Sequence, residues 1–276
     1  MTRPAPTPST PTARNLPRRW LAIGLGALLL AALVGGAMGV SYLFLRPAAP
    51  AAVGLSSASP STTAAATAAA EASAASAGST AAASTSSGTT TGSIDGTWNV
   101  DSSIGSFSDF SGSFVGYRVE EELATVGAAT AVGRTPDVTG SVTLDGATIS
   151  AVEISANLST LQSDKTQRDG QLHRQALETD TYPTATFSLT QPIDLGAAPT
   201  DGRVIQATAT GNLTIHGVTK SVEIPVEARL SGNVVTVTGS IDILFADYSI
   251  SRPTSFAVLT IADHGTLEFQ LQLTRA

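Results

Sequence analysis

The 276-residue sequence contains no cysteine, only three histidines and few charged residues, which make up 13% of it. Without cysteine there is no disulfide scaffold, no thiol nucleophile and no thiolate metal site. The three histidines, His173, His216 and His264, are widely separated, and no His-x-x-x-His pair or cluster of carboxylates accompanies them. This pattern argues against a metal site, and we expect neither a metal nor a cofactor.

Motifs that carry catalysis are also missing. The sequence has no Gly-x-Ser-x-Gly motif and no phosphate-binding loop. Glu120, Glu121 and Glu122 are consecutive on a predicted strand, where neighbours point to opposite faces, so they cannot form a catalytic carboxylate pair. We therefore expect no catalytic residue and no enzyme activity. Glu121 falls on the apolar side of its strand, either at a rim or as a buried polar contact for a ligand.

The charge is unevenly distributed along the chain. Residues 1–93 carry five arginines against one glutamate, a net charge of +4, whereas residues 94–276 carry 10 basic against 21 acidic residues, a net charge of −11. An acidic body argues against nucleic acid as a partner, because that affinity comes from neutralised phosphates. It argues equally against electrostatic docking on anionic lipid headgroups.

The N-terminal part of the chain predicts a membrane anchor. Residues 1–19 form a Pro/Thr/Arg-rich tail that we expect to be disordered and cytoplasmic. Residues 20–45 are apolar and uncharged, which is long enough for a transmembrane helix. Arginines gather before this segment and only Arg46 follows it, so the following domain should be extracytoplasmic. The alternative is a cleaved signal peptide, which would make the protein secreted, although the run is longer than the usual apolar region of about 7–15 residues.

Residues 46–93 are a low-complexity tract of Ala, Ser and Thr. The tract has few of the large apolar side chains that offset the entropy of ordering, so it is predicted to be a disordered linker. A free chain of this length has a root-mean-square reach of roughly 40 Å.

Residues 94–276, about 180 residues, have the size of one domain. Apolar and polar residues alternate with period two in several runs, which indicates antiparallel strands with one face in water. These runs are residues 117–123, 152–158, 184–189, 205–215, 222–230, 235–243 and 267–273. Eight or so such strands either close into a barrel or stack as a sandwich. The fold class is therefore all-β, mainly antiparallel.

Residues 163–177 interrupt the alternation. They contain good helix formers, with Ser163 or Asp164 as the predicted N-cap, and Tyr182-Pro183 follows before the next strand. We expect one short helix that serves as a lid or plug at a barrel end.

A long hairpin is predicted around residues 211–226. If both apolar faces lie on one side, Ile215 pairs with Val222 and residues 217–220 form a four-residue loop. His216 then lies on the solvent-facing side of the hairpin, beside the turn. We interpret it as a structural residue of the turn and not as a catalytic or binding residue. His264, within an Asp-His-Gly turn, is interpreted in the same way.

Small residues recur on the apolar faces of these strands, and they leave room inside a barrel of about eight strands for one ligand. Alternatively, they allow close packing at barrel corners. The residues predicted to line an apolar tunnel are Ala156, Phe187, Ala207, Ala209, Leu213, Ile215, Val222, Ile224 and Val226.

Four motifs resemble the YceI-like family of lipocalin-like proteins that bind polyisoprenoids. They are Gly96-Thr-Trp-Asn-Val-Asp101, the run from Leu161 to Phe187 with Tyr182-Pro-x-Ala-x-Phe187, the stretch Gly211-x-Leu-Thr-Ile-His-Gly-Val-Thr-Lys220, and Asp247-Tyr-x-Ile250. The resemblance implies an extended antiparallel barrel that holds a long isoprenoid or similar amphiphilic lipid along its axis, in an exported protein with no established catalytic activity. Ser102-Ser103-Ile104 and the extra residues 105–116 depart from the family pattern.

Arg168, Asp169 and His173 lie on the predicted helix and are candidates for contacts with a lipid headgroup, for which Arg is the natural donor. The alternative is a solvated helix face or a local Arg–Asp pair. At the level of function, the sequence predicts a membrane-tethered, non-enzymatic lipid-binding protein. The competing hypothesis is a structural or interaction domain of the cell envelope with a filled barrel core.

Overall fold

The computed structural model describes residues 49–55, 94–125, 127–253 and 258–276. All of them belong to one compact unit. The predicted tail, the apolar segment 20–45 and residues 56–93 of the linker lie outside the described residues. Within the described ranges, no helix is long and apolar enough to cross a bilayer.

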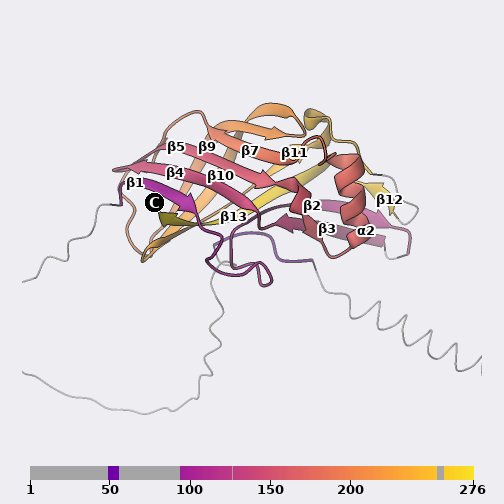
Figure 1. Ribbon diagram of the computed structural model, residues 1–276, viewed down its shortest axis with the longest axis horizontal. Coiled ribbons are helices and arrows are strands. Elements are labelled where there is room, and N and C mark those ends of the chain that lie inside the picture. Colours follow the sequence, from indigo (N-terminus) through magenta and orange to yellow (C-terminus); the bar gives the residue numbers. More distant parts are fainter. Residues whose placement is uncertain (1–48, 56–93, 126, 254–257) are drawn as a thin grey trace, which may run out of the picture. The chain divides into compact units, whose positions relative to one another are not determined.

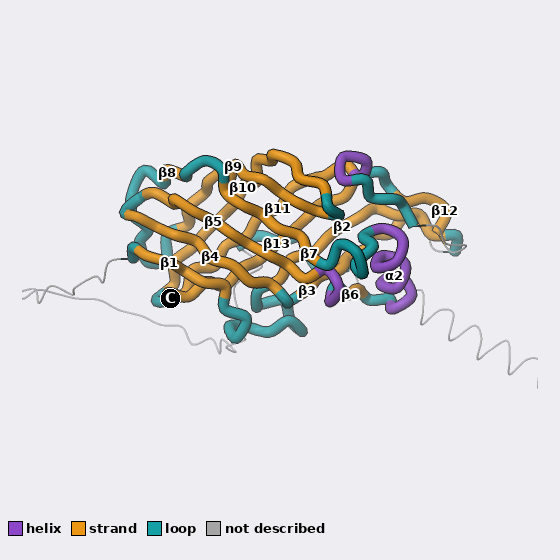
Figure 2. Tube along the Cα trace, turned by 45° about the horizontal axis from the view of Figure 1, so that its top comes forward, coloured by secondary structure: helices purple, strands orange, loops and turns teal. Residues whose placement is uncertain are grey.

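Eight antiparallel strands close into a barrel, the one of the two arrangements left open by the alternating pattern that the family resemblance implied (Figures 1 and 2). Each strand pairs with the next around the ring, and pairing of the last with the first closes it. In ring order they are β1 (Gly96–Val100), β4 (Val138–Asp145), β5 (Thr148–Asn157), β7 (Thr184–Leu189), β9 (Val204–Ile215), β10 (Val218–Ser231), β11 (Val234–Leu244) and β13 (His264–Arg275). The antiparallel barrel is favoured over the sandwich because β1 and β13 leave no open edge between them.

The wall continues beyond the ring at one end. The second half of β13 pairs with β1, whereas its first half pairs with β2 (Phe114–Leu123). Next to β2 lie β3 (Gly127–Thr135) on one side and the short β12 (Val258–Ile261) on the other, and β6 (Gln162–Ser163) pairs with β3. At the opposite end, β8 (Ile193–Asp194) pairs with the start of β5.

The predicted helix is present but short. It consists of α2 (Thr166–Gln171), which continues as the π-helical turn η2 (Leu172–Ala176). Its N-cap is Lys165, with no side-chain cap bond, instead of Ser163 or Asp164. Two single turns, η1 (Leu158–Thr160) and η3 (Phe245–Tyr248), complete the helical content of the described residues. α2 lies at the end of the barrel that carries β6 and β12, away from β8 (Figure 2).

The β9–β10 hairpin is tighter than predicted. Ile215 pairs with Val218 and not with Val222, so the turn contains only His216 and Gly217. Both turn residues have positive φ, 51° and 72°, as a two-residue type I′ turn requires. Val222 instead pairs with Gly211. The register shifts by an even number of residues, so the predicted inner face is preserved although the pairing was wrong.

Two apolar clusters lie inside the barrel, one toward each end. The first, which we call the β1-end cluster, is built around Trp98, Val138, Leu144, Ala156, Leu230, Leu271 and Leu273. The second, which we call the α2-end cluster, is built around Leu158, Leu161, Leu177, Ala185, Leu213, Ile215 and Tyr248. Most residues of the β1-end cluster line a cavity, which is the candidate site described below.

Candidate functional site

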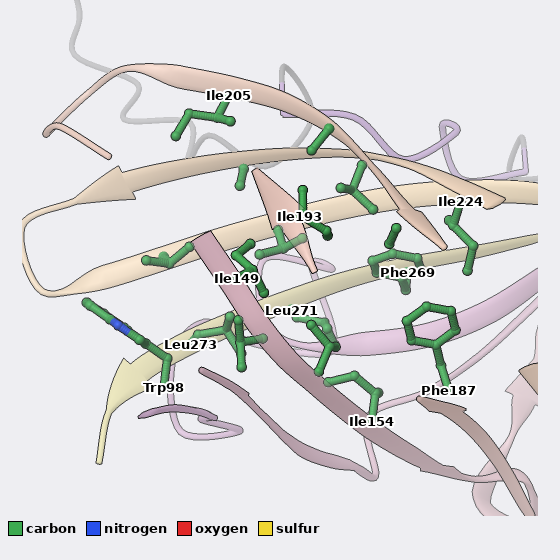
Figure 3. A pocket seen from close by; sticks show the side chains of 18 of the residues that line it. Trp98, Ile149, Ile154, Phe187, Ile193, Ile205, Ile224, Phe269, Leu271 and Leu273 are labelled. Carbon is green, nitrogen blue, oxygen red and sulfur yellow. The ribbon is translucent and has the colours of Figure 1, made fainter. Parts of the chain in front are cut away.

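An apolar cavity of about 180 Å³ occupies the half of the barrel near β1 and β8 (Figure 3). Apart from Thr186 and Arg229, every residue that lines it is apolar. Side chains labelled in Figure 3, among them Trp98, Ile149 and Leu273, converge on this space from different strands of the ring. Such a lining can accept hydrocarbon and offers few groups for hydrogen bonds.

The cavity exists because small side chains occupy several inward-facing positions of the barrel wall, each opposite a larger residue of the neighbouring strand. On β9 and β10, Ala209 pairs with Ile224 and Ala207 pairs with Val226. All four line the cavity. An alanine removes most of the volume that a leucine or phenylalanine would fill, so the wall retreats from the barrel axis here.

Seven of the nine predicted wall residues line the cavity. They are Ala156, Phe187, Ala207, Ala209, Leu213, Ile224 and Val226. The other two, Ile215 and Val222, lie in the α2-end cluster, beyond the inner end of the cavity.

Several lining residues were not proposed from the sequence. Phe269 and Leu271 belong to the alternating run 267–273, so the period-two pattern already indicated that they face the barrel axis. Trp98 and Ile193 come from the short strands β1 and β8, whose length carries almost no periodicity.

Phe187 stands at the inner end of the cavity. It lines the cavity and also packs on the α2-end cluster, as do Leu213 and Leu267. Its ring lies over Gly211, where a Cβ atom would come within 2.4 Å of the ring. On the facing wall, Phe269 lies over Gly239 in the same way, with a corresponding distance of 2.5 Å. The two glycines therefore give the aromatic rings the space in which they lie against the wall.

The α2-end cluster contains polar groups that have no partner. The hydroxyl groups of Tyr117 and Tyr248 are buried and make no hydrogen bond within the described residues. Burial raises the pKa of both tyrosines. Phenols that give up their hydrogen bonds to water reduce the stability of this half of the barrel relative to an all-hydrocarbon core.

The three candidate headgroup residues on the helix are engaged with protein groups and do not line the cavity. Arg168 donates to Glu121 at 2.6 Å and also bonds Asp164. Asp169 accepts two hydrogen bonds from Ser163, at 2.9 and 2.6 Å.

His173 is held by the Leu161 carbonyl oxygen, 2.9 Å from Nε2, and by the Thr179 hydroxyl, 3.2 Å from Nδ1. All three candidates are thus used to fasten the helix to the barrel. Among the described residues, no group of three or more His, Cys, Asp or Glu is gathered as metal ligands would be.

Glu121 is a buried partner for the helix. Its side chain is only 6% exposed and bonds Arg168, whose side chain is 20% exposed. Burial lowers the pKa of Arg168, but the charges and hydrogen bonds of Glu121 and Asp164 outweigh this effect and leave the pKa raised. The arginine is therefore charged and committed to these two carboxylates.

His216 is a structural residue of the hairpin turn. Its Nδ1 lies 3.1 Å from the carbonyl oxygen of Tyr248, and its ring packs edge-on against Tyr182 at 4.5 Å between centroids. The His216 side chain is only 9% exposed, so the prediction that it lies on the solvent-facing side of the hairpin is wrong.

Comparison with solved structures finds several proteins that are similar to this chain. A polyisoprenoid-binding domain from Saccharophagus degradans implicated in plant cell wall breakdown has a TM-score of 0.50 and 19% identity, with 66% of this chain and 99% of that chain covered. BcnA from Burkholderia cenocepacia has a TM-score of 0.47 and 21% identity over 63% of this chain and 98% of its own. A Campylobacter jejuni YceI protein has a TM-score of 0.44 and 18% identity over 52% and 84%, respectively.

No curated protein matches the sequence. The YceI-like domain, in contrast, matches residues 67–273, about three quarters of the chain. This match extends over every strand of the closed ring, including the β9–β10 hairpin and the motif around Tyr182. The chain therefore belongs to the YceI-like family.

Proposed function

We propose that the barrel binds an apolar, chain-like ligand, a polyisoprenoid or a similar amphiphilic lipid, in the cavity between β1 and Phe187. The observation that carries this proposal is the cavity itself, an empty space in a closed barrel whose lining is apolar except for two residues. Membership of the YceI-like family and the similarity to a polyisoprenoid-binding domain support the same ligand class.

The size of the cavity limits how much ligand it holds. At about 180 Å³ it exceeds the engineered apolar cavity of about 150 Å³ that takes up benzene. It is smaller than the roughly 300–1,000 Å³ of ordinary ligand pockets. A long chain must therefore project from the β8 end, or push Phe187 and the α2-end cluster apart.

The proposed function is binding and not catalysis. None of the described residues that line the cavity is a Ser, Cys, His, Asp or Glu, so the lining offers no carboxylate or imidazole base that could activate the hydroxyl of Thr186. Arg229 is the single charged residue among the described residues of the lining.

The proposed location is outside the cytoplasmic membrane, with the uncharged segment 20–45 as the anchor. The length and charge pattern of that segment support this part of the proposal. Flotation of the full chain with liposomes after alkaline carbonate washing would be expected for an integral anchor, and release into the wash would contradict it.

The test of binding is native mass spectrometry of the full chain in detergent, offered farnesol, geranylgeraniol and longer polyprenols. The wild-type protein should retain a prenol, and Ala209→Trp, which fills the cavity, should lose it without unfolding. The matched control is Ala151→Trp, at an exposed position outside the lining. If Ala209→Trp destabilises the protein by about 1–3 kcal/mol and the wild type binds no prenol, the barrel is a packed core and the structural-domain hypothesis replaces this one.

A further inference from the structure

The outer face of β13 is polar and yet buried. Glu268, Gln270 and Gln272 are 1%, 2% and 5% exposed, although their neighbours Leu267, Phe269 and Leu271 line the cavity on the other side. Two segments cover this outer face. One is the β1–β2 connection, whose carbonyl oxygens at Phe110, Gly112 and Ser111 accept hydrogen bonds from the two glutamine side chains. The other is residues 49–55, which we call the clamp segment (Figure 1).

The clamp segment lies over a buried group of charges. Arg134 donates to Glu268 from Nε at 3.0 Å and from Nη2 at 2.7 Å, and Arg118 donates to the same carboxylate at 3.4 Å. The side chains of Arg134 and Glu268 are 4% and 1% exposed. Two cations thus share one anion in a site with little water, and they need further acceptors.

The guanidinium of Arg134 is also enclosed by aromatic rings. Phe110 and Phe114 each lie with their ring centroid 4.3 Å from its Cζ atom. The faces of these rings carry negative potential, so they stabilise the cation, but they accept few hydrogen bonds. The remaining donor atoms must therefore be satisfied from the open side of the group.

The clamp segment supplies two further acceptors. Arg118 Nη2 donates to the carbonyl oxygen of Pro50 at 2.7 Å, and Arg134 Nη2 donates to that of Ala51 at 3.2 Å. Leu55, at the end of the segment, is only 5% exposed. Two charge-assisted hydrogen bonds and one buried leucine hold seven residues that the composition had assigned to a linker.

We propose that the clamp segment is an integral part of the barrel domain and that it shortens the tether between the barrel and the membrane. This inference rests on the proposed anchor at residues 20–45. Only residues 46–49 separate that segment from Pro50, and four fully extended residues span at most about 14 Å. A free linker over residues 46–93 would reach roughly 40 Å instead.

A short tether has a consequence for the proposed ligand. A barrel held at the bilayer surface can exchange an apolar ligand with the membrane without carrying it through water. Leu55 and Ile94 both lie on the barrel domain, so residues 56–93 connect two parts of that domain. They therefore add nothing to the distance that the tether between barrel and membrane can span.

The absence of native cysteine allows a direct test with pairs of spin labels. Labels at Ala49→Cys and Glu122→Cys, both at exposed positions, report the distance between the clamp segment and the barrel wall. In the full chain, double electron–electron resonance should give a narrow distance distribution. Arg118→Gln, which removes the bonds of Arg118 to Pro50 and Glu268 and leaves the Arg134–Glu268 pair in place, should broaden it, whereas the control Arg203→Gln, at an exposed position, should not.

A second variant replaces residues 49–55 by alternating Gly and Ser and leaves every barrel residue unchanged. In vesicles of phosphatidylethanolamine and phosphatidylglycerol, energy transfer from a dye at Glu122→Cys to a lipid-bound acceptor should fall relative to the wild type. A broad spin-label distribution in the wild type, or a narrow one that disappears on dilution with unlabelled chain, would overturn the intramolecular clamp.

The two proposals fail separately. A wild-type chain that retains no prenol but gives the narrow distribution loses the proposed ligand and keeps the clamp. A chain that does not associate with vesicles loses the anchor, and with it the tether, whereas the spin-label result still decides whether the segment is docked.

Discussion

The ring of Phe187 rests on Gly211 of the neighbouring strand. An added Cβ at position 211 would lie 2.4 Å from the ring Cζ and 2.4 Å from the carbonyl oxygen of Ser188. Both distances are far below van der Waals contact, and one of the two obstacles is backbone. This pair therefore determines where the inner end of the cavity lies, because the ring can lie flat against the wall only where the neighbouring strand has no side chain.

We expect Gly211→Ala to destabilise the barrel by about 1–3 kcal/mol, the usual cost of overpacking. Chemical denaturation followed by circular dichroism measures the change in the free energy of unfolding. Gly170→Ala is the control, because a Cβ there meets only the flexible end of Arg174 and Ala is the better helix former. Equal stability of Gly211→Ala and the wild type would show that the ring is not confined by the glycine.

Replacement of Phe187 by Ala should lengthen the cavity toward the α2-end cluster. Prenols of increasing chain length, offered together in native mass spectrometry, should then be retained with a preference for longer chains than in the wild type. Phe187→Trp should shift the preference toward shorter chains. An unchanged preference in both variants would place the length limit elsewhere, for example at Leu213 or Leu267.

Tyr117→Phe should stabilise the protein at neutral pH by about 1 kcal/mol, because it removes a buried hydroxyl that has no hydrogen-bond partner in the part of the chain that the structure describes. Burial raises the pKa of Tyr117 above the ordinary value of about 10. As the pH rises, Tyr117 of the unfolded state therefore ionises before Tyr117 of the folded state. The wild type keeps its neutral-pH free energy of unfolding below about pH 10 and loses part of it as the pH rises toward the folded-state pKa.

Denaturation at pH 7 and at about pH 10.5 measures this difference. The wild type should lose more stability between the two values than Tyr117→Phe does. Tyr182→Phe is the control, since it leaves both buried hydroxyls in place. A pH dependence of Tyr117→Phe equal to that of the wild type would contradict burial of this phenol.

The alternating pattern was sufficient to predict which residues face the barrel axis but not how the strands pair. On β9 and β10 the inner residues were identified correctly, because a shift by an even number of residues keeps each side chain on its face. The register depended on the turn, where His216 adopts a positive φ that few residues other than glycine accept. Its contacts with Tyr248 and Tyr182 come from distant parts of the sequence.

The outer face of β13 shows a second limit of sequence interpretation. Alternation distinguishes the two faces of a strand, and it led us to expect that Glu268, Gln270 and Gln272 face water. They are buried because the residues added at 105–116 and the clamp segment fold over them. Nothing in the period-two pattern reports such a cover, and the small residues of the clamp segment resemble the rest of the linker in composition.

The ion pair between Glu121 on β2 and Arg168 on α2 should fasten the helix to the barrel end. Among the described residues, Glu121→Gln leaves Arg168 with only the exposed Asp164 as a charged partner, and we expect a loss of about 1.5–3 kcal/mol, the range for hydrogen bonds to charged groups. Asp164→Asn, at a carboxylate that is 49% exposed, should cost less than about 1 kcal/mol.

A double-mutant cycle with Glu121→Gln and Arg168→Met separates the pair from other effects of each substitution. A coupling energy above about 0.5 kcal/mol, together with faster amide hydrogen exchange in residues 166–176 of each single variant, is the expected result. Because the Glu121 side chain is only 6% exposed and that of Asp164 is 49% exposed, added salt should weaken the Glu121–Arg168 coupling less than it weakens the coupling to Asp164. A coupling near zero would mean that the helix is held by the contacts of Leu172 and Leu177 with the α2-end cluster, and not by the charges.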